Sequence, residues 1–425
     1  MLIEHKKQQI QGLQVHVVPT KKFKTTTIIL KLNAPLQQDT VTLRALLPHV
    51  LQNATSRFTS TSKLRSYLDD LYGAHLFVDL AKKGENHVIT FTLEVANEKY
   101  LQDSTPLFEK AAEFFSELIH HPLLENNKFN QDVLRKEKRA MEQRIQAVYD
   151  DKMRYANLRL VQEMCKNEPY KLHVNGEIDD VNNITSESLF NYYQKSTDND
   201  KADLYVVGDI EEKVVVDTVS KYFSFSQRDN TRTTMSHCVE VVDQKEIKEE
   251  QDVKQGKLNM GYRTNITYAD DLYYSLQVFN GVFGGFSHSK LFRNVREKES
   301  LAYYAASRVE SHKGLLMVMS GIDSSNYNKA VTIINEQLDA IKNGSFTDEE
   351  ILQTKAVLRN QILETVDTAR GIVEVLYHNE LSLVDRPLNN WLKGVEAVSK
   401  DDIINAANLV QLDTIYFLTG KEGGQ

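Results

Sequence analysis

The sequence contains little cysteine, and it has no long hydrophobic run. Its two cysteines, Cys165 and Cys238, lie far apart in a chain of 425 residues. So few thiols form neither a disulfide framework nor a zinc–thiolate site, and they favour a reducing compartment. No apolar stretch approaches the ~18–20 residues of a membrane span. Residues 1–12 have neither the apolar core nor the small-residue cleavage site of a secretory signal. We therefore expect a cytoplasmic protein with no membrane partner.

The sequence also lacks an excess of positive charge. Lys and Arg total 51 against 59 Asp and Glu, which gives a formal net charge of −8 at pH 7. A nucleic-acid binder needs a dense cationic surface to displace counterions, so we expect no nucleic-acid partner. The composition, 41% hydrophobic and 26% charged, is that of an ordinary soluble globular protein. At ~100–200 residues per domain, the length predicts roughly two to four hydrophobic cores.

Helical and strand patterns are mixed along the chain, and the strands come largely as hairpins. Residues 12–35 carry strand-like runs on both sides of a Lys-rich turn, and residues 75–95 alternate as a hairpin. Residues 62–73 have helical spacing of leucines and end at a glycine. The stretches 130–164 and 347–371 each have the pattern of a long helix. This mixture favours an α+β fold over a doubly wound parallel one.

The second half of the chain repeats the first. Residues 63–76 resemble 290–304, and residues 129–145 resemble 346–362. A repeat of this length indicates two copies of one folding unit. We expect two homologous halves, each an antiparallel-rich sheet with helices packed on one face.

The predicted domains are residues 1–235 and 245–425. The charged stretches 226–238 and 243–256 lack the apolar periodicity needed to pack, so either is a candidate for the linker.

The phrase VREKESLAYY (295–304) follows a Gly-rich turn and precedes a strand pattern. Together with the duplication, it resembles the C-terminal half of the insulinase-type (pitrilysin-family) zinc peptidases. The resemblance covers essentially the whole chain, at the size of the family's short two-domain subunits, and implies a fold like that of the mitochondrial processing peptidase. In that family an Arg and a Tyr seven positions later bind the substrate beside the zinc. The resemblance places these roles on Arg296 and Tyr303.

The chemistry of Arg296 and Tyr303 suits that role. A guanidinium is a planar, permanently charged donor for a peptide carbonyl or a developing oxyanion, and a phenol can donate to the same oxygen. The alternative is that Arg296 belongs to a solvated surface with Glu297, Lys298 and Glu299, and that Tyr303 is a core aromatic residue.

The zinc motif is where the sequence departs from the family. Active members carry H-x-x-E-H on the first long helix of the N-terminal half, so that two histidines meet one zinc while the Glu acts on its water. Aligning RALLPHVLQNAT with that helix places Ala45 at the first His, Pro48 at the Glu and His49 at the second His. The match for the third ligand is Glu137. A catalytic zinc normally needs three protein ligands, so we expect this degenerate set to hold no metal and the chain to bind no cofactor of its own.

Two other features are candidates for chemistry. The Gly-rich turn 281–290 lacks the P-loop spacing, and either a mobile loop over a substrate chamber or a plain helix-ending turn fits its pattern. The adjacent His120 and His121 point about 100° apart on a helix, which favours capping or a surface position over metal binding.

Three functions remain open from the sequence. The first is the partner subunit of a heterodimeric metallopeptidase: inactive alone, it would supply Arg296 and Tyr303 to a zinc site held by a homologous H-x-x-E-H-containing subunit, with a peptide substrate enclosed between them. The second is a non-enzymatic scaffold or assembly protein of the same fold. The third is an independent hydrolase that uses His49, Glu137 and a further ligand. Within the family, the chain most resembles a bacterial short subunit associated with elongation-factor-P modification.

Overall fold

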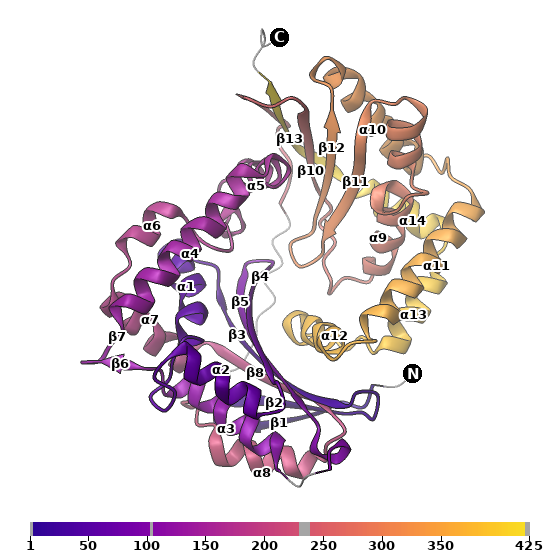
Figure 1. Ribbon diagram of the computed structural model, residues 1–425. Coiled ribbons are helices and arrows are strands. Elements are labelled where there is room, and N and C mark those ends of the chain that lie inside the picture. The colour runs from indigo at the N-terminus through magenta and orange to yellow at the C-terminus, as the bar shows by residue number, and fades with distance from the viewer. Residues whose placement is uncertain (1–2, 103–104, 229–238, 421–425) are drawn as a thin grey trace.

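Two sheets, one in each half of the chain, organise the protein. The computed structural model describes residues 3–102, 105–228 and 239–420 (Figure 1). The first sheet has the strand order β1-β2-β8-β3-β5-β4, and the second has the order β11-β12-β10-β13-β9. The strands of the first sheet are β1 (Lys6–Ile10), β2 (Leu13–Pro19), β3 (Thr25–Pro35), β4 (His75–Lys83), β5 (Asn86–Ala96) and β8 (Lys201–Gly208). Those of the second are β9 (Lys245–Gln251), β10 (Gly256–Arg263), β11 (Ala302–Glu310), β12 (Leu315–Ile322) and β13 (Gln411–Gly420).

The strand orders confirm the duplication. Reading from β4 in one sheet and from β11 in the other, each strand has a counterpart at the same place, and β1 is an addition at the far edge of the first sheet. Each sheet contains one parallel pair at the corresponding position, β2 with β8 and β9 with β13, and its other pairs are antiparallel. The fold is therefore the predicted α+β arrangement of two homologous halves.

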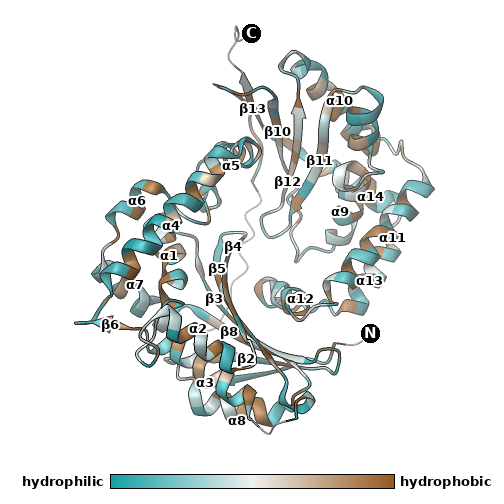
Figure 2. Ribbon diagram, viewed as in Figure 1, coloured by the Kyte–Doolittle hydropathy of each residue, from teal (hydrophilic) through white to brown (hydrophobic). Residues whose placement is uncertain are grey.

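Each half places most of its helices on one face of its own sheet. In the first half the inner strands alternate, so that Val15, Ile28 and Leu204 join one apolar cluster with the helices of that half. In Figure 2 the apolar residues of these helices lie mainly on the side that faces the strands. The helices of this half are α1 (Val41–Leu51), α2 (Thr61–Asp70), α3 (Leu107–His120), α4 (Gln131–Asp150), α5 (Lys152–Met164), α6 (Ile178–Asn183), α7 (Ser186–Asn199) and α8 (Glu212–Tyr222).

The second half has the corresponding layer of helices. They are α9 (Tyr273–Asn280), α10 (Tyr327–Lys342), α11 (Asp348–Thr365), α12 (Ala369–Ser382), α13 (Leu388–Ala397) and α14 (Lys400–Asn408), with wide helical turns η3 (Gly281–Gly285) and η4 (Phe292–Lys298). The remaining short elements are β6 (Leu124–Glu125), β7 (Lys128–Phe129), η1 (Glu98–Tyr100), η2 (Pro169–Lys171) and η5 (Ser324–Asn326).

The two predicted long helices are each broken, which the sequence analysis did not foresee. The first ends at Asp150, and the side chain of Asp151 accepts hydrogen bonds from two backbone N–H groups to begin α5. The second ends at Thr365, and the side chain of Thr368 caps α12 by accepting a backbone hydrogen bond. A polar N-cap inside an otherwise helical pattern is sufficient to start a new helix in a new direction.

These breaks let each half pack a helix against the sheet of the other. Helix α5 lies on the second sheet, where Leu160 and Met164 join a cluster with Leu315 and Tyr416. Helix α12 lies on the first sheet, where Val373 shares a cluster with Ile29 and other residues of its strands. Figure 1 shows α12 seated in the concave face of the first sheet. The two halves are thus joined by reciprocal helix contacts.

One of the two linker candidates is wrong. Residues 243–256 contain β9, which pairs in parallel with β13 at the edge of the second sheet. An edge strand needs main-chain pairing but few buried side chains, so its KEIKEEQ sequence is charged and has weak periodicity. The predicted boundary at residue 235, and most of the other candidate stretch 226–238, lie outside the described residues.

Candidate functional site

Helix α1 carries the positions aligned with the lost zinc motif. Ala45 is fully buried, and the helix runs without a break through Pro48, which is also buried. An alkyl side chain and an imino acid thus occupy the two places where a zinc ligand and a general base are expected. Neither offers a lone pair to a metal or accepts a proton from water.

The two candidate ligands, His49 and Glu137, are linked through the side chain of Asn53. The amide Nδ2 of Asn53 donates to the backbone carbonyl of His49 at 2.7 Å and to the Glu137 carboxylate at 3.1 Å. Lys136 lies 3.8 Å from the same carboxylate. Within the described residues, neither His49 nor Glu137 belongs to any group of three or more residues placed to hold a metal ion.

Arg144 brings a positive charge close to His49. The motif alignment gave no sign of this residue. It lies on α4, seven residues after Glu137, and therefore on the same side of the helix. Burial is the main cause that lowers the pKa of His49 to about 4, and the charge of Arg144 acts in the same direction. Two of the guanidinium nitrogens of Arg144 are buried and form no hydrogen bond with the described residues. At neutral pH the family's metal position therefore has an uncharged His49 imidazole on which the Arg144 cation acts.

A second arginine fixes the start of the same helix. Arg44 is about 1% exposed and forms an ion pair with Asp200. Its guanidinium also donates to the backbone carbonyls of Leu32 at 2.7 Å and His87 at 3.0 Å. Helix α1 is thereby tied to the sheet by a satisfied buried charge, which is a structural role.

Arg296 and Tyr303 have the opposite environment. Arg296 is exposed on η4, and its guanidinium lies over the ring of Phe292, 4.6 Å from the centroid. Tyr303 is 76% exposed. Within the described residues neither side chain forms a hydrogen bond or an ion pair. Tyr303 is therefore not the core aromatic residue of the alternative interpretation.

Local structure explains the exposure of Tyr303. The pairing of β11 with β12 shifts between Ala302 and Tyr304, which leaves Tyr303 as an extra residue in the strand. Such a bulge turns a side chain away from the regular alternation of a strand. The next residue, Tyr304, is half-buried, and its hydroxyl has no hydrogen-bond partner among the described residues. Burial, followed by the charge of Asp151 at the α4–α5 junction, raises the pKa of Tyr304 to about 12.

The other two sequence candidates are structural. In the Gly-rich turn, a Cβ on Gly284 would lie 2.6 Å from side-chain atoms of both Leu291 and Ser307, so close packing requires the glycine. His121 is the exposed C-cap residue of α3, as the capping or surface alternative expects, whereas His120 is half-buried. It stacks edge-on against Phe225 with centroids 4.6 Å apart, and burial lowers its pKa to about 4.

The fold and these sites together define a class: a duplicated, metallopeptidase-like protein whose metal position is filled by other residues. The comparisons agree. Residues 183–358 match the family model described as "Peptidase M16 inactive domain". The chain is 58% identical to "Probable inactive metalloprotease YmfF" of Bacillus subtilis (strain 168) over 412 residues, 97% of each chain. The protein therefore belongs to the M16 peptidase family, as an inactive-metalloprotease-like member.

Two further likenesses extend this assignment. A conserved protein of Enterococcus faecalis V583 has a solved structure that covers 99% of this chain and all of its own, with 33% identity and a TM-score of 0.93. "Uncharacterized zinc protease YmxG" of Bacillus subtilis (strain 168) is 24% identical over 298 residues, 68% of this chain and 67% of its own. Among the described residues, no helix combines the length and the apolar character that a bilayer crossing requires.

Proposed function

We propose that this chain is the non-zinc-binding subunit of a heterodimeric M16 metallopeptidase. It would supply Arg296 and Tyr303 to the zinc site of a homologous subunit that carries H-x-x-E-H. The observation that carries the proposal is the contrast between the two sites of this chain. At the metal position, buried Ala45 and Pro48 replace a ligand and the general base, whereas Arg296 and Tyr303 are exposed and make no hydrogen bond or ion pair within the described residues.

The proposed division of labour follows from the chemistry of each group. The zinc of the partner subunit would polarise the scissile carbonyl and activate a water. Arg296 would donate to the carbonyl oxygen as negative charge develops on it, and the Tyr303 hydroxyl would donate to the same oxygen. A side chain with no internal partner can make such a bond without first breaking another.

The relatives are consistent with a two-subunit arrangement. The names of two relatives from the same organism, Bacillus subtilis, describe one as a probable inactive metalloprotease and the other as a zinc protease. A cell can therefore contain both kinds of chain that the proposal requires.

The test is reconstitution. This chain is purified alone and together with an H-x-x-E-H-bearing M16 subunit from the same genome, and cleavage of a peptide library is measured. The chain alone should be inactive, the pair should elute as one complex, and the pair should cleave peptides faster than the zinc subunit alone. A stable complex without peptidase activity would favour the scaffold, and no complex with any such subunit would contradict the proposal.

A further inference from the structure

The face of the first sheet that receives α12 is unusually polar for a buried surface. His16 on β2, Lys31 on β3 and Asp203 on β8 all have side chains no more than about 3% exposed. They meet α12, which contributes Glu374 and Glu380. Buried ionisable groups are costly unless they are paired or ligate a metal, so each of them needs a partner.

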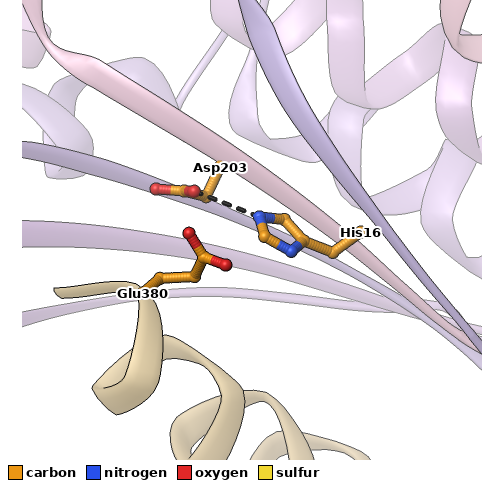
Figure 3. A group of neighbouring side chains, drawn as sticks. All are labelled: His16, Asp203 and Glu380. Atoms are coloured by element: carbon orange, nitrogen blue, oxygen red, sulfur yellow. Dashed lines mark hydrogen bonds and ion pairs between the residues drawn. The ribbon is translucent and has the colours of Figure 1, made fainter. Parts of the chain in front are cut away.

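Lys31 has an evident partner in the Glu374 carboxylate, and Lys83 donates to the same carboxylate. His16, Asp203 and Glu380 form a different kind of group. One ligand-type atom from each lies within 4.8 Å of the other two, and Figure 3 shows the three side chains converging from two strands and a helix. His16 and Asp203 are buried, and Glu380 is half-buried.

The distances suit a shared metal ion. His16 Nε2 lies 3.1 Å from Asp203 Oδ1. Two ligands about 2.0–2.1 Å from a tetrahedral zinc are separated by ~3.3 Å, so a metal could replace this contact with only a small shift. One imidazole and two carboxylates are ligands that divalent transition metals accept.

The surroundings of His16 also resemble those of a metal ligand. Its other ring nitrogen, Nδ1, lies 2.9 Å from Nε2 of His5. With its ring nitrogen at this distance, a neutral His5 imidazole can accept a hydrogen bond from His16 Nδ1. A ligating histidine usually donates its second N–H in this way, which fixes the tautomer that binds the metal.

We propose that His16, Asp203 and Glu380 bind a divalent transition-metal ion such as Zn²⁺ where α12 crosses the first sheet. The metal would join the two halves of the chain, because β2 and β8 belong to the first half and α12 to the second. It is distinct from the family's catalytic position on α1 and α4. The expectation from sequence that the chain binds no metal rested on that catalytic position, and the present proposal departs from it. It does not depend on the proposed peptidase partnership.

Lys7 is the competitor for this site. Its Nζ donates to both Glu380 oxygens, at 2.7 and 2.8 Å. The side chain of Lys7 is 44% exposed, so it can swing into solvent when a metal takes the carboxylate. His5, Lys7 and Glu380 line a cavity of about 420 Å³, so the Glu380 side of the site adjoins a hollow from which a metal and a water ligand could arrive. Removing the Lys7 ammonium should therefore strengthen metal binding.

The test is a calorimetric titration of the full chain with ZnCl₂ after treatment with a chelator. Wild type should bind about one equivalent. Glu380→Gln, a change at a half-buried carboxylate that preserves shape, should weaken binding at least tenfold, and His16→Asn should do the same if it folds. Lys7→Met should tighten binding several-fold.

His49→Ala is the matched control, because it removes a histidine from the family's own metal position. It should leave the zinc affinity unchanged. Three outcomes would overturn the proposal: no binding by wild type and by Lys7→Met, binding that Glu380→Gln does not weaken, or binding that is lost in His49→Ala.

Discussion

Arg44 and Arg144, in the region of α1 and α4, have environments opposite to that of Arg296 on η4. In the first region, Arg44 and Arg144 direct their charges inward, one to a buried carboxylate and one beside His49. In the second, Arg296 is exposed and lies against the face of Phe292. Arg44 thus has a structural role, whereas the side chain of Arg296 is exposed to solvent.

The comparison separates two ways in which a site can differ from that of an enzyme. The metal position has not simply lost its ligands, since a proline and an alanine are packed there and the Arg144 charge acts on His49. The Arg296 and Tyr303 segment is exposed although exposure of an aromatic ring contributes nothing to folding. This difference is expected if the chain has given up metal chemistry and retained substrate contact.

The largest expected effect is on stability, from Arg44→Ala. Removing this guanidinium leaves Asp200 as a buried unpaired charge and leaves the Leu32 and His87 carbonyls without their donor. Breaking a buried pair typically costs about 3–5 kcal/mol. Urea unfolding should show a loss of this size. Arg139→Ala, at an exposed position of α4, is the control and should change stability by less than about 0.5 kcal/mol.

Arg296→Ala should impair activity and leave stability almost unchanged. Because its side chain is exposed, the free energy of unfolding should change by less than about 0.5 kcal/mol. Peptide cleavage by the reconstituted pair should fall on the order of 10²–10³-fold, the usual effect of losing one oxyanion donor. Tyr303→Phe, which removes only the hydroxyl, should also slow cleavage without affecting assembly of the pair.

The matched control for both variants is Lys298→Ala. Lys298 is an exposed cation on the same turn as Arg296, and the proposal gives it no role in catalysis. Its replacement should leave both cleavage and stability unchanged. Full activity of both Arg296→Ala and Tyr303→Phe would remove these residues from the mechanism and favour the scaffold.

A smaller effect is expected when the zinc motif is rebuilt. Pro48→Glu alone should bind no zinc at this position, because Ala45 still leaves the site without a ligand. The double variant Ala45→His/Pro48→Glu restores the motif, but the charge of Arg144 still opposes a divalent cation near His49. Adding Arg144→Met should raise zinc affinity on the order of tenfold or more in a competition assay with a chelator. Equal affinity with and without Arg144→Met would show that its charge does not reach the site.

Much of the fold could be predicted from the sequence because the two halves have similar short segments in the same order. The segments around Lys63 and Lys290 precede corresponding edge strands, β4 and β11, and Phe129 and Phe346 precede corresponding helices, α4 and α11. What could not be predicted depends on contacts distant in sequence. Nothing local indicates that the helix begun at Asp151 or at Thr368 crosses to the other half's sheet.

The candidate site was likewise predictable only where it depends on local sequence. The loss of the zinc motif could be predicted because it depends on residue types at fixed spacing. The role of Arg144 could not, because it depends on how close α4 lies to His49. The exposure of Tyr303 depends on a β-bulge, and no residue in this segment predicts a bulge. The roles of Arg296 and Tyr303, a zinc-bearing partner, the cytoplasmic location and the link to elongation factor P stay predictions.

The smallest expected effect is on the pKa of His49. Burial is the main cause that lowers it to about 4, and the charge of Arg144 is the second. Arg144→Met should therefore raise the pKa but leave it below the ordinary value of about 6.5. A folded-state pKa below the unfolded value means that His49 contributes stability fully above about pH 6.5. That contribution is lost as the pH falls toward 4, with a slope of at most about 1.4 kcal/mol per pH unit.

An NMR titration of the His49 ring gives the pKa directly, and Arg139→Met is the matched control. An unchanged pKa in Arg144→Met would mean that the cation does not act on His49, and the contrast between the two arginine environments would then rest on Arg44 alone.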